Sequence, residues 1–399
     1  MDWIENGGIT APLGFLAAGI ASGIKSGNKK DLALIVSERD AKVGTAYTSN
    51  LIKAAPVKIS MQHNRRSKVK GVVINSGNAN CATGIRGIRD AQRMVDKTAS
   101  AIGCKHNQVL VCSTGKIGEY LPIMKIMKGI TKAAKKLSGT SGRAAARAIM
   151  TTDTFTKESA ATVDISGAQV TIGAMAKGAG MIHPDMATML AFVTTDACID
   201  AKVLQSLTTR CVTNTFNRIS VDGDTSTNDT VLVLANGMAE NALINEDHPD
   251  LQKFEEALYT IMSSLAKMIV LDGESISHVV HLKVHGAVDH VDAKRVAEAI
   301  ARSPLVRSSW AGNDPNWGRV MDVVGYSGAR VEEETLDIFY DGLNAVRGGV
   351  ATRVPLSRLK AVAAKKEYSL CIDLHLGEGE YELFVNDLTP GYVKFNMGE

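Results

Sequence analysis

The chain has 399 residues, of which 45% are hydrophobic and 22% charged. Its 45 lysines and arginines stand against 42 acidic residues, and a formal net charge of +3 gives no electrostatic reason to expect nucleic acid as a partner. No apolar run is long enough to span a bilayer, and the first residues lack the apolar core of a signal peptide. We therefore expect a cytoplasmic protein without a membrane partner.

Short apolar runs and amphipathic segments alternate in the first half of the chain. Apolar residues recur at helical spacing between Ile88 and Ile102, which predicts a helix that follows a buried strand. In order, the expected elements are strand 72–75, loop 76–87, helix 88–102, strand 108–112 and a helix from about Leu121 to Ile130.

The same alternation continues to the C-terminus. The expected elements are strands 169–174 and 188–195, helices 254–269 and 293–302, and strands 369–375 and 381–385. Strand–loop–helix units of this kind predict a layered α+β fold, in which polar loops at strand ends gather active sites. The loop Ser113-Thr114-Gly115 at the end of one predicted strand is such a position.

Six scattered cysteines show neither paired spacing nor a cysteine–histidine cluster, so neither a disulfide framework nor a structural zinc site is expected. The acidic run VDGDTSTND, which contains Asp222, Asp224, Ser226 and Asp229, superficially resembles a cation-binding loop. The calcium-loop pattern requires glycine and glutamate at two positions that hold Thr227 and Val233 here, so the match fails. We predict a network of hydrogen bonds in a turn and no metal.

The most informative stretch is KGAGMIHPDMATMLAF, residues 177–192. A turn rich in glycine, with Pro184, leads to the pair Ala187-Thr188 and then to an apolar run. This is the layout of a chain that cuts itself before a threonine: the new α-amino group, with an ordinary pKa near ~8, can then take the proton of the threonine hydroxyl. The pattern alone favours an ordinary turn followed by a buried strand, because an Ala-Thr pair is common.

Several blocks of the sequence resemble the ornithine acetyltransferase (glutamate N-acetyltransferase) family of arginine biosynthesis. Besides the stretch around Thr188, they are GGITAPLGF (7–15), INSGNANCATG (74–84), STGKIG (113–118), TTDTFTK (151–157), FNRISVDGDTSTND (216–229), DGES (272–275) and GNDPNWGR (312–319). The resemblance covers essentially the whole chain. It implies an αββα sandwich built from two self-cleaved fragments, an α chain (1–187) and a β chain (188–399), assembled as an α2β2 heterotetramer.

The resemblance also implies roles for individual residues. Thr188 is expected to be the nucleophile that carries acetyl from N2-acetylornithine to glutamate in a ping-pong cycle, after cleavage at Ala187-Thr188. Thr114 and Gly115 match the oxyanion hole, which an acyl transfer requires for its tetrahedral intermediate. The expected substrate-binding residues are Thr151, Lys177 beside the nucleophile and the substrate carboxylate, Glu274 at the cationic amine, and Asn396 at the α-carboxylate. No cofactor is expected, and acetyl-CoA would be a second acetyl donor only in a bifunctional member.

The sequence departs from the family at two places. Ser275-Ile276-Ser277-His278 replaces the usual glycine, alanine, threonine and lysine after Glu274, and the chain ends at Glu399, where relatives usually extend and add a hydroxyl contact to the carboxylate. These departures leave open a self-cleaving amidohydrolase or aminopeptidase, or an acyltransferase with another amine or acyl substrate. A non-enzymatic binding protein that never cleaves is the third alternative.

Overall fold

The computed structural model describes residues 1–64, 68–183 and 189–397, and these form two compact units. The larger unit holds the described residues of Met1–Gly178, Asp185–Asn217 and Thr225–Ile269; the smaller holds those of Ala179–Pro184, Arg218–Asp224 and Val270–Glu399. Each unit thus contains residues from both sides of position 187. The compact units are not the predicted fragments 1–187 and 188–399, and that boundary stays a prediction.

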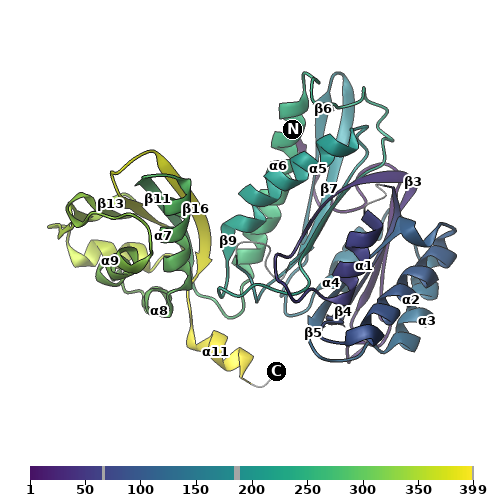
Figure 1. Cartoon of the computed structure of the whole chain (residues 1–399), viewed down its shortest axis with the longest axis horizontal. Helices are drawn as coiled ribbons and strands as arrows, with labels where there is room; N and C mark the ends of the chain where they lie inside the picture. Colours follow the sequence, from purple (N-terminus) through teal and green to yellow (C-terminus); the bar gives the residue numbers. More distant parts are fainter. Residues whose placement is uncertain (65–67, 184–188, 398–399) are drawn as a thin grey trace. The chain divides into compact units, whose positions relative to one another are not determined.

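Within the described residues, nine strands form the sheet of the larger unit (Figure 1). They are β1 (Asp2–Trp3), β2 (Phe15–Ile20), β3 (Leu32–Tyr47), β4 (Val69–Asn78), β5 (Val109–Lys116), β6 (Lys157–Ile165), β7 (Ala168–Lys177), β8 (Leu190–Thr195) and β10 (Thr230–Ala235). Their order is β1-β6-β7-β8-β10-β3-β4-β5, and β2 also pairs with β3. The start of the long strand β3 pairs with β2 and β4, while its end pairs with β10. A register shift between Val36 and Ala41 marks the bulge at which β3 passes from one half-sheet to the other.

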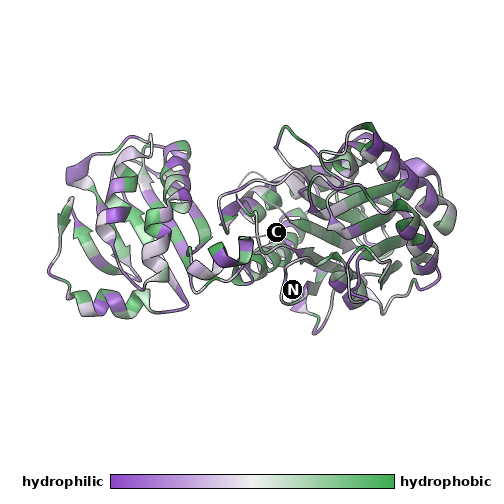
Figure 2. Ribbon diagram, turned by 90° about the horizontal axis from the view of Figure 1, so that it is seen from below, coloured by the Kyte–Doolittle hydropathy of each residue, from purple (hydrophilic) through white to green (hydrophobic). Residues whose placement is uncertain are grey.

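The two half-sheets share one apolar core. Phe192 and Leu232 from one half lie in the same buried cluster as Ile35 and Ile74 from the other. In the half-sheet of β2, β3, β4 and β5, the alternate residues, such as Leu34, face α2 and α3. The helices α5 and α6 lie beside the other half-sheet, which β1, β6, β7, β8 and β10 form (Figure 1). In Figure 2 the strands of this unit are mostly hydrophobic and the helices carry the hydrophilic residues outward. The layers are therefore helix, sheet, sheet and helix, which confirms the predicted α+β sandwich.

The predicted elements of the larger unit are observed. Its helices are α1 (Ala55–Asn64), α2 (Gly84–Ile102), α3 (Ile123–Ala134), α4 (Gly142–Ile149), α5 (Ala201–Asn214) and α6 (Leu251–Leu271, whose last residues belong to the smaller unit), with short 3-10 turns at His106–Gln108 and Phe216–Arg218. α2 begins four residues before its predicted start, and β8 begins at Leu190, since Thr188 lies outside the described residues. Within those residues, no helix is both long and apolar enough to cross a membrane.

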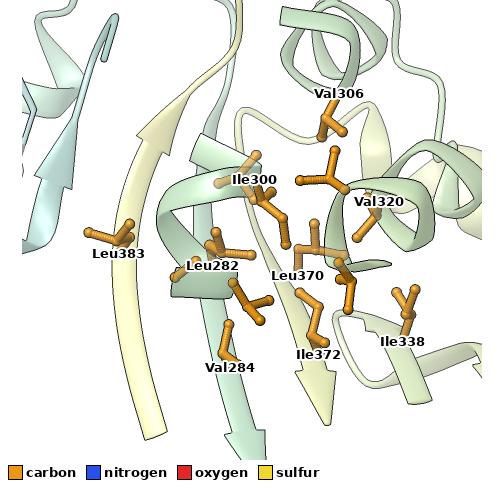
Figure 3. Close-up of a cluster of buried hydrophobic side chains, with 14 of the residues drawn as sticks. Leu282, Val284, Ile300, Val306, Val320, Ile338, Leu370, Ile372 and Leu383 are labelled. Atoms are coloured by element: carbon orange, nitrogen blue, oxygen red, sulfur yellow. The ribbon is translucent and has the colours of Figure 1, made fainter. Parts of the chain in front are cut away.

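The smaller unit has its own sheet, with β14-β13-β12-β15-β11-β16-β9 as the strand order. Its elements are β9 (Ile219–Ser220), β11 (Val279–Ala287), α7 (His290–Arg302), α8 (Pro304–Ala311), α9 (Trp317–Tyr326), a 3-10 turn (Glu333–Thr335), β12 (Asp337–Tyr340), β13 (Leu343–Arg347), β14 (Val350–Ala351), α10 (Leu356–Ala363), β15 (Glu367–Asp373), β16 (Gly379–Asn386) and α11 (Pro390–Asn396). Leu282 and Leu370 of the sheet pack against Ile300, Val306 and Val320 of three helices (Figure 3). Helix 293–302 and strands 369–375 and 381–385 are thus confirmed, to within two residues at most ends.

Candidate active site

The loop that carries Thr114 and Gly115 is the end of strand β5. Parallel pairing places Thr114 opposite Ser76 and Gly115 opposite Gly77, after which the register shifts at Asn78. Thr114 is buried, and Gly115 has a φ of +129°, a conformation that favours glycine. A Cβ on Gly115 would lie 2.3 Å from the carbonyl carbon of Gly77. Only glycine therefore allows the two strand ends to approach this closely.

Two consecutive side chains tie this strand end to the residue that follows position 188. The Asn228 amide donates to the carbonyl oxygens of Ser113 at 2.8 Å and of Ala79 at 2.7 Å. Next in the chain, Asp229 Oδ1 accepts the backbone N–H of Met189 at 3.0 Å. All of these residues belong to the larger unit. The predicted oxyanion loop and the neighbour of the predicted nucleophile are therefore held by one short segment.

Asp229 is fully buried. Burial raises its pKa well above the ordinary value of a carboxyl group, although the Met189 N–H and the nearby charge of Lys177 act in the opposite direction. Among the described residues, its second oxygen, Oδ2, has no hydrogen-bond partner. A buried acceptor left unsatisfied costs stability.

Lys177, the last residue of β7, is buried in a group of charged side chains. Asp153 Oδ1 lies 2.7 Å from Nζ of the equally buried Lys157 and accepts the N–H of Gly178 at 2.8 Å. Burial by itself would raise the pKa of Asp153, but the charges of Lys177 and Lys157 outweigh it and lower this pKa to about 2. Asp153 Oδ2 accepts the N–H of Thr151 at 2.9 Å. The structure thus gathers the predicted binding residues Thr151 and Lys177 around one carboxylate.

A second buried amine, Lys25, belongs to the same charged surroundings. Its Nζ donates to the carbonyl oxygens of Lys30, at 3.2 Å, and of Met150. Burial, together with the nearby charge of Lys177, lowers its pKa to about 8, although the charges of Asp31 and Asp153 oppose the change. A positive region therefore surrounds Asp153, of the kind that attracts a carboxylate ligand.

Glu274 and Asn396 lie in the smaller unit and contact each other. The Asn396 side-chain amide donates to Glu274 Oε2 at 3.2 Å and to the carbonyl oxygen of Tyr392 at 3.1 Å. The backbone N–H of Glu274 donates to the carbonyl oxygen of Ala179 at 2.9 Å. The Asn396 amide is thus engaged by Glu274 and Tyr392, and the binding roles of Glu274 and Asn396 stay predictions.

The residues that depart from the family pattern after Glu274 are anchored within the smaller unit. The N–H of Ser277 donates to Asp387 Oδ1 at 3.0 Å, and the buried ring of His278 bonds to Asp387 Oδ2 at 3.0 Å. Ser275 has a positive φ of 55°, and its carbonyl oxygen accepts the hydroxyl of Thr389 at 2.6 Å. Ser277 and His278 are therefore engaged in fixing the loop that carries Glu274.

Ala187 and Thr188 lie outside the described residues, as does Pro184. The thiol nearest in sequence to the predicted oxyanion loop is Cys112, and burial raises its pKa to about 12, so it is not available as a thiolate nucleophile at neutral pH. All six cysteines are free. In the part of the chain that the structure describes, no three histidine, cysteine or acidic side chains converge as ligands for a metal ion.

Sequence reasoning missed four residues of this site: Lys25, Asp153, Asn228 and Asp229. The last two lie in the acidic run that was interpreted as a turn network, and that interpretation accounts for only part of their contacts. The available signal was the placement of Asn228-Asp229 directly before a strand of six buried residues, β10. An acid at the entrance of such a strand is buried with it and needs a specific partner.

The class of protein that this geometry defines is a helix–sheet–sheet–helix sandwich with polar and charged side chains gathered at its strand ends. The model of the ArgJ family matches residues 16–398. A protein of Symbiobacterium thermophilum called Arginine biosynthesis bifunctional protein ArgJ is 45% identical over 398 residues, or 99% of each chain. Its counterpart in Geobacter sulfurreducens, with the same name, is 44% identical over 96% of this chain and 98% of its own.

A solved structure supports the same conclusion. The crystal structure of Arginine biosynthesis bifunctional protein ArgJ from Bacillus halodurans has a TM-score of 0.51 and 40% sequence identity. The match covers 53% of this chain and 100% of that one. The chain belongs to the ArgJ family.

Proposed function

We propose that this protein is an acetyltransferase of arginine biosynthesis. It cuts itself between Ala187 and Thr188 and then moves acetyl from N2-acetylornithine to glutamate through an acetyl-Thr188 intermediate. The observation that carries the proposal is the pair Asn228 and Asp229, which links the end of β5 to Met189. Relatives that match nearly the whole chain are named for arginine biosynthesis, which supports the pathway.

In the self-cleavage step, Thr188 Oγ attacks the carbonyl carbon of Ala187, and the acyl group passes from nitrogen to oxygen. Water then hydrolyses the ester, which gives a carboxylate on Ala187 and a free α-amino group on Thr188. That amine is the base for the second reaction, because its ordinary pKa of about 8 leaves part of it neutral.

In the transfer step, Thr188 Oγ attacks the acetyl carbon of N2-acetylornithine and its proton goes to the α-amine. The resulting ammonium group passes this proton to the departing nitrogen as the C–N bond breaks, which releases ornithine. The glutamate amine then attacks the acetyl ester and regenerates the hydroxyl. The Thr114 hydroxyl and the Gly115 N–H stabilise the oxyanion in both halves of the cycle. Glu274 receives the cationic amine of the donor, Asn396 binds its α-carboxylate, and Thr151 and Lys177 complete the binding of the charged substrate.

Three finer points belong to the same proposal. The relatives are called bifunctional, which agrees with acetyl-CoA as a second donor that forms the acetyl-enzyme. Acetyl-CoA would then be a co-substrate, and the enzyme would hold no bound cofactor. The cleaved fragments assemble as an α2β2 heterotetramer. The enzyme works in the cytoplasm, in agreement with its six free cysteines.

The test is the intact mass of the purified protein incubated with N2-acetylornithine, before and after the addition of glutamate. We expect two fragments divided at Ala187-Thr188, of which the C-terminal one gains an acetyl group that glutamate removes. Acetyl lost equally fast without glutamate would establish a hydrolase instead. Clean fragments that never gain acetyl would exclude this donor, and a single uncut chain would exclude the mechanism.

A further inference from the structure

The segment that precedes β3 is folded around one fully buried carboxylate, that of Asp31. Its two oxygens accept four consecutive backbone N–H groups, those of residues 22–25, at 2.6 to 3.1 Å. Through its own carbonyl oxygen, Asp31 also accepts the N–H of Ser76 at 2.9 Å, and Ser76 is the residue opposite Thr114. The turn that carries Lys25 is therefore fixed to the strand end that holds the predicted oxyanion loop, and all of these residues belong to the larger unit.

The methylene stem of Lys25 covers a glycine of this strand end. A Cβ on Gly77 would lie 3.0 Å from Cγ of Lys25 and 3.6 Å from its Cε. Gly77 pairs with Gly115, and the φ values of these two residues are +99° and +129°. Glycine has more backbone freedom to lose than any other residue. A side chain packed against Gly77 therefore supplies a restraint that Gly77 cannot supply itself.

The ammonium group at the end of this stem is fixed by a helix end. Nζ donates to the carbonyl oxygen of Met150, which caps the C-terminus of α4, and to that of Lys30 at 3.2 Å. The last carbonyl groups of a helix lack partners within the helix, and a lysine ammonium is a favourable donor to them. Beside this contact, the Ser76 hydroxyl donates to the carbonyl oxygen of Ala148 at 2.6 Å. The Lys25 side chain thus connects the end of α4 with the end of β4.

We propose that Lys25 is a positioning residue for acetyl transfer, which holds the end of β4 so that Gly115 keeps its backbone conformation; this inference rests on the proposed function. The Gly115 N–H stabilises an oxyanion only if it points to the place where the charge develops. Lys25 packs on Gly77, and Gly77 lies so close to Gly115 that a Cβ there would be 2.3 Å from its carbonyl carbon. A change at Lys25 therefore reaches the oxyanion loop through Gly77, without any contact between Lys25 and the substrate.

The experiment measures acetyl transfer from N2-acetylornithine to glutamate, with rates expressed per cleaved chain. Lys25→Met keeps an unbranched stem and removes the ammonium group, while Lys25→Ala removes both. We expect kcat to fall about 10- to 100-fold in each variant, with both KM values within about twofold of the wild type, as misplacement of a catalytic group does. Lys25→Arg keeps a cationic donor and should recover part of the rate. The matched control is Lys29→Met, since Lys29 is exposed in the same segment, and it should turn over like the wild type.

A double-mutant cycle shows whether Lys25 acts through the oxyanion loop. In the Thr114→Ala background, Lys25→Met should cost much less than it does in the wild type, because the loop is already impaired. Fully additive losses, or a raised KM with an unchanged kcat, would overturn the inference, since Lys25 would then act elsewhere or bind the substrate itself.

Thermal unfolding identifies a variant that fails to fold, and if Lys25→Ala does so, Lys25→Met decides the question. Wild-type kcat in Lys25→Met, beside a slowed Thr114→Ala, would overturn this inference and leave the proposed function intact. A wild-type enzyme that never transfers acetyl would overturn both.

Discussion

Gly180 leaves no room for a side chain because Glu274 lies against it. A Cβ on Gly180 would stand 2.6 Å from the carboxyl carbon and from Oε1 of Glu274. The φ of Gly180 is not among the positive values, so the reason for glycine here is space and not backbone freedom. The glycine-rich turn before the predicted cleavage site therefore also shapes the surroundings of the predicted amine-binding carboxylate.

We predict that Gly180→Ala displaces the Glu274 carboxyl group and weakens binding of N2-acetylornithine. A hydrogen bond to a charged group contributes about 1.5–3 kcal/mol, so KM should rise by about 10- to 100-fold with a smaller change in kcat. Steady-state kinetics of the cleaved enzyme measure this. Gly325→Ala is the control, since a Cβ there meets no atom within 4 Å. An unchanged KM would contradict this prediction.

Thr188→Ala is expected to stop both cleavage and acetyl transfer, because the same hydroxyl is proposed to act in each reaction. The purified variant should give one species near 42.5 kDa and show no acetylation by mass. Thr209→Ala, on the exposed face of α5, should be cut and active like the wild type. A Thr188→Ala chain that is still cut at position 187 would show that another group performs the cleavage.

Thr114→Ala tests the oxyanion loop. Removal of one oxyanion donor costs about 10²- to 10³-fold in kcat, and we expect that loss in acetyl transfer with little change in KM. Cleavage, which passes through a similar tetrahedral intermediate, should also slow down. Thr209→Ala again serves as the control. Normal turnover by Thr114→Ala would remove this hydroxyl from the role.

The stability of the protein should depend on Asp153 in acid. Its pKa in the folded protein, about 2, is below the ordinary value of 3.8 for an aspartate. The folded state therefore takes up this proton at lower pH than the unfolded state does. The stabilisation is complete above about pH 4 and is lost as the pH falls towards 2, and a shift of this size corresponds to about 2 kcal/mol.

Asp153→Asn should lower the free energy of unfolding at pH 7 by about 3–5 kcal/mol, because it leaves the buried Lys157 without its carboxylate. The acid-dependent part of the unfolding curve should also become flatter. Urea unfolding between pH 2 and 7 measures both effects. Asp164→Asn is the control, since the Asp164 side chain is 62% exposed. A variant with wild-type stability would show that the Asp153–Lys157 pair contributes nothing.

Sequence periodicity predicted those helices and strands whose apolar residues repeat at clear helical or strand spacing, such as α2, α6 and β4. It did not predict others, such as α1 and α4. It could not predict how β3 joins the two half-sheets. The middle of that strand reads Ser37-Glu38-Arg39-Asp40, which has the composition of a surface turn, and only the pairing of both its ends with other strands keeps it extended. Tertiary contacts therefore decided what local propensity could not.

The candidate site was predictable where the resemblance supplied a motif and not elsewhere. Thr114, Thr151 and Lys177 were named from such motifs, and the roles assigned to them stay predictions. Asp153 was not named, and Asp229 was named only as part of a network of hydrogen bonds in a turn, because an acid in a polar run is usually exposed in solution. Their importance comes from complete or nearly complete burial, which depends on elements far away in the chain.

Strand β7 precedes the predicted cut and strand β8 follows it, yet the two are antiparallel neighbours from Ile172–Thr195 to Lys177–Leu190. A cut between them would therefore leave two polypeptides joined by a ladder of main-chain hydrogen bonds. Complete denaturation would separate them, and regaining the native state would require the encounter of two molecules in place of the closure of one loop. Renaturation of the mature enzyme should thus be second order in protein concentration. Dilution should therefore slow the refolding of the cleaved protein.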